Sequence, residues 1–115
     1  MKKYIALTVL AATCAVSIAE ARPTSHPDKY AAQLARGWAQ ANSDEGIGFN
    51  GCESRQVQGL LRFVCTGHVV ELMFGGHPIS AGFGCYVDFR PSAQKGFYEK
   101  LRGACRVENE PSEPI

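Results

Sequence analysis

The apolar residues of this chain change their spacing along the sequence, and each change marks a new structural element. Between Pro27 and about Asn42 they recur every three or four residues, which places them on one face of a helix. This face holds Tyr30, Leu34, Trp38 and Ala41. Ser25 precedes the segment as an N-cap and Asp28 follows three residues later, a combination typical of a helix start. We therefore predict an amphipathic helix from Pro27 to Asn42.

From Phe49 to Arg90 the pattern changes to an alternation of apolar and polar residues, interrupted by glycines. Successive side chains of a strand point to opposite faces of a sheet, so this region predicts antiparallel strands with an apolar face. Four strands are expected, at about 51–57, 60–66, 68–74 and 82–89. The sequence Gly75-Gly76-His77-Pro78 separates the third strand from the fourth.

A second helix is predicted after Pro91, with Ser92 as its N-cap. Its apolar stripe has four-residue spacing and consists of Phe97, Leu101 and Cys105. Gly96 and Gly103 weaken this helix by about 1 kcal/mol each relative to alanine. An N-terminal helix, about four antiparallel strands and a C-terminal helix form an α+β domain.

The first 21 residues differ from this domain in composition. Two lysines precede an apolar run from about Tyr4 to Ile18, which ends at the small-x-small sequence Ala19-Glu20-Ala21. This order is typical of a secretory signal peptide, which we assign to residues 1–21. The run is shorter than the ~20 residues that span a bilayer. We therefore expect no stable membrane insertion after cleavage, and a periplasmic or secreted location.

Residues 108–115 form the other end of the chain and contain three glutamates and two prolines. A short acidic segment with little apolar surface cannot bury enough area to order itself, so we predict a disordered tail. The folded domain then spans residues 22–107. Within the exported chain basic and acidic residues balance, because the whole sequence carries a net charge of only +1 and loses two lysines and one glutamate with the signal peptide. This balance argues against nucleic acid and favours a protein partner.

Four cysteines remain after signal cleavage, and an even number in an exported chain indicates two disulfides. If Gln58-Gly59 is a two-residue hairpin turn, counting outward from it places Cys52 opposite Cys65. This position is non-hydrogen-bonded, where α-carbons approach to about 4.5 Å and a disulfide fits. The remaining pair, Cys85 and Cys105, would attach the last helix to the sheet.

The pairing of the arginines and the spacing of the cysteines both affect the disulfide prediction. The same hairpin register places Arg55 opposite Arg62, which argues against it because like charges repel across strands. A metal site is the alternative use of the cysteines, but the chain has no Cys-x-x-Cys pair and no zinc-knuckle spacing. We therefore expect structural disulfides and no metal.

By alternation, one face of the predicted sheet mixes apolar side chains with arginine and tyrosine, which are residue types that interfaces favour. This face consists of Arg55, Val57, Leu60, Arg62, Val64, Val69, Glu71, Met73, Tyr86, Asp88 and Arg90. This face is open to solvent if both predicted helices pack on the other face of the sheet, and it is covered if one helix packs on each face. The candidate binding residues are Arg55, Arg62, Glu71, Met73, Tyr86, Asp88 and Arg90, together with His77 in the glycine-rich connection.

The sequence carries no recognisable catalytic or cofactor-binding motif, so no catalytic residue and no cofactor are predicted. The preferred hypothesis is a small exported binding protein, such as an inhibitor or an immunity-type protein. The competing hypothesis is a small exported hydrolase that uses His68 or His77 with Glu71 or Asp88 as an acid–base pair. A structure separates the two by showing whether an imidazole and a carboxylate converge.

Overall fold

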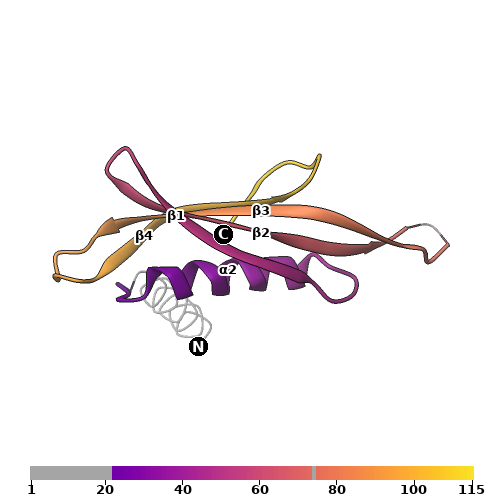
Figure 1. Ribbon diagram of the computed structural model, residues 1–115, viewed down its shortest axis with the longest axis horizontal. Helices are drawn as coiled ribbons and strands as arrows, with labels where there is room; N and C mark the ends of the chain where they lie inside the picture. Colours follow the sequence, from indigo (N-terminus) through magenta and orange to yellow (C-terminus); the bar gives the residue numbers. More distant parts are fainter. Residues whose placement is uncertain (1–21, 74) are drawn as a thin grey trace, which may run out of the picture.

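The computed structural model describes residues 22–73 and 75–115, so the predicted signal peptide lies outside the described residues. Within them, one α-helix precedes five strands, all in a single antiparallel sheet whose strand order follows the chain (Figure 1). The elements are α2 (Pro27–Ala41), β1 (Gly48–Val57), β2 (Leu60–Leu72), β3 (Pro78–Pro91), β4 (Tyr98–Val107) and β5 (Glu113–Pro114). The protein is therefore α+β, as the sequence predicts.

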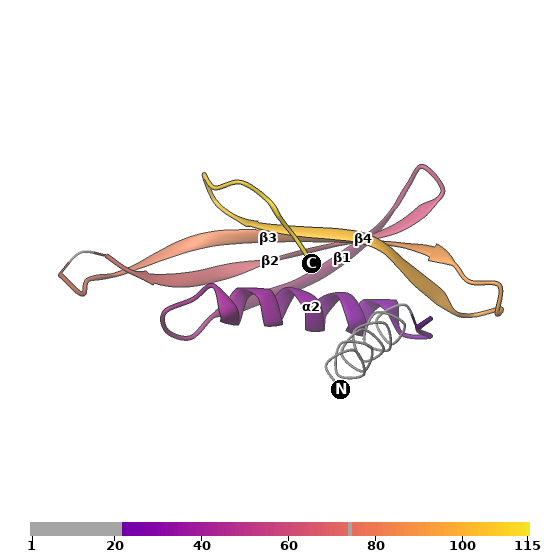
Figure 2. The ribbon, with the colours of Figure 1, turned by 180° about the vertical axis from the view of Figure 1, so that it is seen from behind.

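The helix α2 lies along one face of the sheet, as both ribbon views show (Figures 1 and 2). Its buried row is made of alanines, because Ala31, Ala35 and Ala39 are fully buried and four residues apart. These small side chains let α2 approach the sheet closely. The larger residues of the predicted apolar face, Tyr30, Leu34 and Trp38, flank this row and pack against the core.

The start of α2 differs from the prediction. The N-cap residue is His26, not Ser25, and it makes no side-chain capping bond. Instead, the His26 backbone N–H donates to Oγ1 of Thr24 at 3.0 Å, and Pro27 occupies the first turn. Proline has no N–H group there that needs a partner, which reduces the need for a capping side chain.

The hydrophobic core lies between α2 and the sheet. Its aromatic centre is Phe89, whose ring meets the rings of Phe63 at 5.8 Å and Tyr30 at 5.9 Å in edge-on contacts. The fully or nearly buried residues that the sheet contributes are Phe63, Cys65, Val69, Phe83, Cys85, Val87, Phe89, Cys105 and Val107.

Both predicted disulfides are confirmed, with Cys52 bonded to Cys65 and Cys85 bonded to Cys105. Each bridge joins directly opposed residues of neighbouring strands, with 4.0 Å between their α-carbons. Cys65 also faces Cys85 across β2 and β3. The four cysteines therefore form one row across four strands, on the side of the sheet that α2 covers.

The predicted C-terminal helix is wrong, because its residues form strand β4. A four-residue spacing suits a helix, but it is also twice the two-residue period of a strand, so Phe97, Leu101 and Cys105 do not distinguish the two. The Cys85–Cys105 bridge consequently joins two strands and does not attach a helix to the sheet. Gly103, which would weaken a helix, suits this strand because an added Cβ would lie 3.0 Å from the Tyr86 carbonyl oxygen.

The predicted strands at 60–66 and 68–74 are one continuous strand, β2, of 13 residues. Gly67 lies in its middle and permits close packing there. A Cβ at this position would overlap the carbonyl oxygen of Gly48 and lie 2.6 Å from the Phe83 ring. The glycine reflects this close approach and not the end of a strand.

The last residues of the chain are ordered, which corrects the prediction of a disordered tail. Strand β5 pairs with β4, and the Ile115 N–H donates to the Gly103 carbonyl oxygen at 3.0 Å. The Trp38 Nε1–H donates to Glu113 Oε2 at 3.1 Å. The Ile115 side chain is half-buried against the core. These contacts supply the ordering energy that the composition of the segment lacks.

Replacing Gly67 with alanine is expected to lower the free energy of unfolding by about 1–3 kcal/mol, because the added methyl group overpacks the contact with Gly48 and Phe83. Gly37→Ala is the matched control. An added Cβ at this position in α2 meets nothing within 4 Å, so the helix should gain up to about 1 kcal/mol. Urea denaturation of both variants measures the difference. Equal stability of the two variants would contradict the packing role of Gly67.

Candidate functional site on the open sheet face

The face of the sheet opposite α2, here called the open face, contains rows of residues that cross the four long strands. Antiparallel pairing fixes these rows because directly opposed residues point to the same side of the sheet. The first row is Arg55, Arg62, Asp88 and Arg102; the second is Glu53, Val64, Tyr86 and Ala104; the third is Gly51, Thr66, Gly84 and Arg106. We call the first row the arginine row.

Asp88 is the centre of the arginine row, and its side chain is completely buried. Arg62 donates to both carboxylate oxygens, from Nε to Oδ1 at 2.7 Å and from Nη2 to Oδ2 at 2.9 Å. Arg102 donates from Nε to Oδ2 at 2.9 Å. The guanidinium carbon of Arg62 also lies 4.5 Å from the centre of the Tyr86 ring. Two arginines therefore cover one carboxylate, and one of them is stacked on an aromatic ring.

The electrostatics of this cluster keep Asp88 ionised. The hydrogen bond from Arg62 is the main cause that lowers the pKa of Asp88, with further lowering from Arg102, and together they outweigh the desolvation that acts in the opposite direction. The same hydrogen bond raises the pKa of Arg62. At neutral pH the cluster therefore carries two positive charges and one negative charge.

A β-bulge adjoins the cluster directly beyond the pair of Asp88 and Arg102. The register between β3 and β4 shifts at Asp88 and Phe89, so Arg102 pairs with Asp88 and Lys100 with Phe89, while Leu101 is the extra residue. Leu101 is exposed as a result. Bulges of this kind redirect side chains and are frequent next to functional sites.

The remaining arginines of the face are not neutralised within the described part of the chain. Among residues 22–73 and 75–115, the salt bridges are those of Asp88 and one between Arg90 and Glu99 at 3.3 Å. Arg55 and Arg106 are exposed and belong to none of them. The three rows therefore hold four arginines and two carboxylates, those of Asp88 and Glu53, and a third carboxylate, Glu108, lies near Arg106.

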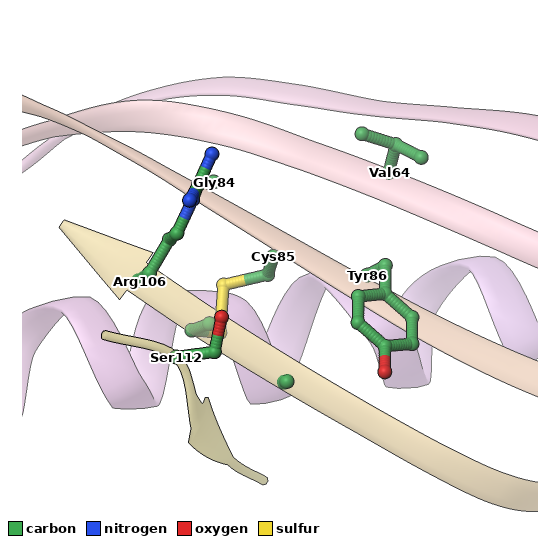
Figure 3. Close-up of a pocket in the computed structure, with 8 residues that line it drawn as sticks. Val64, Gly84, Cys85, Tyr86, Arg106 and Ser112 are labelled. Carbon is green, nitrogen blue, oxygen red and sulfur yellow. A yellow bond between two sulfur atoms is a disulfide. The ribbon is translucent and has the colours of Figure 1, made fainter. Parts of the chain in front are cut away.

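The open face is hollowed along its middle. Three neighbouring hollows, of about 200, 370 and 390 Å³, share lining residues and form what we call the trough. The shared residues are Asn50, Val64, Thr66, Gly84 and Arg106. Figure 3 shows the first hollow, with Tyr86 and Arg106 from the sheet and Ser112 from the β4–β5 connection around it.

Four of the predicted binding residues lie together on this face: Arg55, Arg62, Tyr86 and Asp88. Arg90 lies farther along β3 and pairs with Glu99. Glu71, Met73 and His77 belong to the distant β2–β3 hairpin, where Leu72, Met73 and Ile79 are 45–48% exposed. The prediction thus combined residues from two separate regions.

The predicted face contained an error in strand parity. Val69 is fully buried in the core and does not lie beside Arg62. Since β2 runs without interruption through Gly67, Val69 and Glu71 point to the α2 side with Phe63. Two separate strands at 60–66 and 68–74 would have allowed these side chains to lie on the face of Arg62, but one continuous strand does not.

Arg102 and Arg106 are not among the predicted binding residues, because the sequence pattern predicts a helix for their segment. Their signal was the alternation of Arg102, Ala104 and Arg106 with the buried residues Gly103, Cys105 and Val107. Thr66 and Gly84, which line the trough, were missed because small residues carry no chemical signature of their own.

Two observations argue against Asp88 and against the pair of His68 with Glu71 as the acid–base groups of a hydrolase. Asp88 is held by two arginines, and its lowered pKa makes it a weak base. His68 and Glu71 point to opposite faces of β2. No group of three or more His, Cys, Asp or Glu residues in the described ranges is close enough to hold a metal ion.

The comparisons with known proteins add no relative. The chain matches no protein-family model, no curated protein and no solved structure. Two disulfides fit an exported protein, and none of the helices in the described residues has the length and apolar character to cross a membrane.

Replacing Asp88 with asparagine should lower the free energy of unfolding at pH 7 by about 2–3 kcal/mol. This is less than the ~3–5 kcal/mol typical of a fully buried ion pair, because both arginines are part-exposed and water can solvate them. Glu99→Gln removes the exposed pair with Arg90 and should change stability by less than about 1 kcal/mol. Urea denaturation at pH 7 compares the two variants.

The stability of the wild-type protein should also depend on pH through Asp88. Because its pKa is lower in the folded state, the ionised carboxylate contributes its full stability above its unfolded pKa of about 4. This contribution is lost as the pH falls through the folded pKa. Thermal unfolding between pH 6 and pH 2 should therefore show a smaller loss for Asp88→Asn than for the wild type. Parallel profiles would contradict the role of this carboxylate.

Proposed function

We propose that this protein is a small exported binding protein, of a bacterial kind, that holds a partner protein on its open face, as an inhibitor or an immunity-type protein does. The observation that carries the proposal is the unequal cover of the sheet. The helix α2 packs on one face, whereas the other bears the trough, whose lining includes arginine, tyrosine, glutamate and small residues. Arginine and tyrosine are enriched at the energetic centres of interfaces.

The rigidity of the face also supports this function. Two disulfides hold β1 to β2 and β3 to β4, and the Asp88 cluster ties β2, β3 and β4 together from the other side. A surface that is already ordered loses little conformational entropy when a partner binds. The predicted signal peptide favours the periplasm as the place of action, with release from the cell as the second choice.

Capture of partners from an envelope extract tests the proposal. The tagged protein is compared with Thr66→Tyr, which fills the trough without a change of charge, and with Gln33→Tyr on the exposed side of α2 as the matched control. Thr66→Tyr should lose at least about tenfold of the captured partner, whereas Gln33→Tyr should retain it, as quantified by mass spectrometry. If Thr66→Tyr captures the same proteins in the same amounts as the wild type, the open face is not the binding surface.

A further inference from the structure

The arginine row has more positive than negative charge, and this imbalance indicates what the row binds. The row contains three guanidinium groups, those of Arg55, Arg62 and Arg102, and one carboxylate, that of Asp88, which pairs with Arg62 and Arg102 only. Arg55 directly faces Arg62 across β1 and β2. Like charges in this position repel, and a bound anion between them would convert the repulsion into attraction.

The arginines of this row still have hydrogen-bond donors to offer. Arg62 uses Nε and Nη2 on Asp88, and Arg102 uses only Nε. Their other N–H groups donate to no residue in the part of the chain that the structure describes. Because a guanidinium presents its N–H groups as a planar fork, such free edges suit the two oxygens of a carboxylate.

The orientation of these donors is fixed before any ligand arrives. Asp88 is completely buried and accepts hydrogen bonds from both guanidinium groups, and the Arg62 guanidinium stacks on the Tyr86 ring. The arrangement therefore differs from that of a solvated surface arginine, which would lose much side-chain freedom on binding. Asp88 acts here as a positioning residue and does not itself contact the ligand.

The neighbouring row defines the rest of the ligand. Val64, Tyr86 and Ala104 lie next to the arginine row, about 7 Å away along the strands. Apolar groups beside cations fit a protein surface on which an acidic residue adjoins an apolar one. A nucleic acid fits less well, because a phosphate backbone offers no apolar group to Val64 and Ala104.

We propose that the arginine row binds carboxylate groups of an acidic protein partner, with Val64, Tyr86 and Ala104 receiving a neighbouring aliphatic or aromatic side chain. This inference rests on the proposed function and specifies the chemistry of the partner.

An NMR titration of the purified exported protein, with both disulfides formed, tests this inference. The probe is a synthetic peptide of alternating glutamate and leucine with blocked ends, and its comparison peptide carries glutamine in place of glutamate. Only the glutamate peptide should bind, shifting the amide signals of the arginine row and the Nε–H signals of Arg62 and Arg102. The dissociation constant should rise with salt concentration, because the exposed part of the attraction is screened.

Three variants test whether the arginines of the row contribute to peptide binding. Arg55→Gln and Arg102→Gln should each raise the dissociation constant at least about threefold, while Lys29→Gln on the exposed side of α2 should leave it unchanged. Arg55 belongs to no salt bridge within the described residues, so its removal separates binding from folding. Urea denaturation of each variant confirms that it is folded.

Several results would overturn the inference: equal binding of the two peptides, no binding at millimolar concentration, signal shifts confined to α2, or binding of phosphatidylglycerol vesicles in place of the peptide. Its failure is distinguishable from that of the proposed function. If Thr66→Tyr loses the partner but Arg55→Gln and Arg102→Gln retain it, the open face binds a protein and the carboxylate site is rejected.

Discussion

The register of the four long strands is the constraint on which the rest of the structure depends. Both disulfides join residues that face each other directly, so each one fixes a strand pair to within a single residue. A shift of one residue would exchange the two faces of the sheet. The two disulfides beneath α2 therefore also fix which residues of β1 and β2, and of β3 and β4, lie opposite each other on the open face.

The arginine row is the main chemical consequence of that register. Arg62, Asp88 and Arg102 meet because three strands present them at the same level, and Arg102 faces Asp88 in the same register as the Cys85–Cys105 pair. The cluster buries a carboxylate without leaving it unpaired. It thereby stabilises the sheet and orients two cations toward solvent, so one set of contacts serves both the fold and the proposed binding surface.

The two faces of the sheet divide structural and functional roles. The α2 side of the sheet is apolar and is covered by the alanine row of α2. The open side bears charged residues, the Tyr86 ring and a hollow beside it. Glycine has a different use on each side. Gly67 permits close packing in the core, while Gly51 and Gly84 leave room in the trough.

The sequence by itself determined the features that depend on near neighbours: the helix at residues 27–41, the Gln58-Gly59 hairpin and the pairing of Cys52 with Cys65. Only the tertiary structure decided whether residues 98–107 form a helix or a strand, because a four-residue spacing satisfies both periods. The tertiary structure also decided that Val69 points into the core and that the last residues of the chain are ordered as a strand. The Asp88 cluster belongs to this second group, since its three members come from different strands and meet only through long-range pairing.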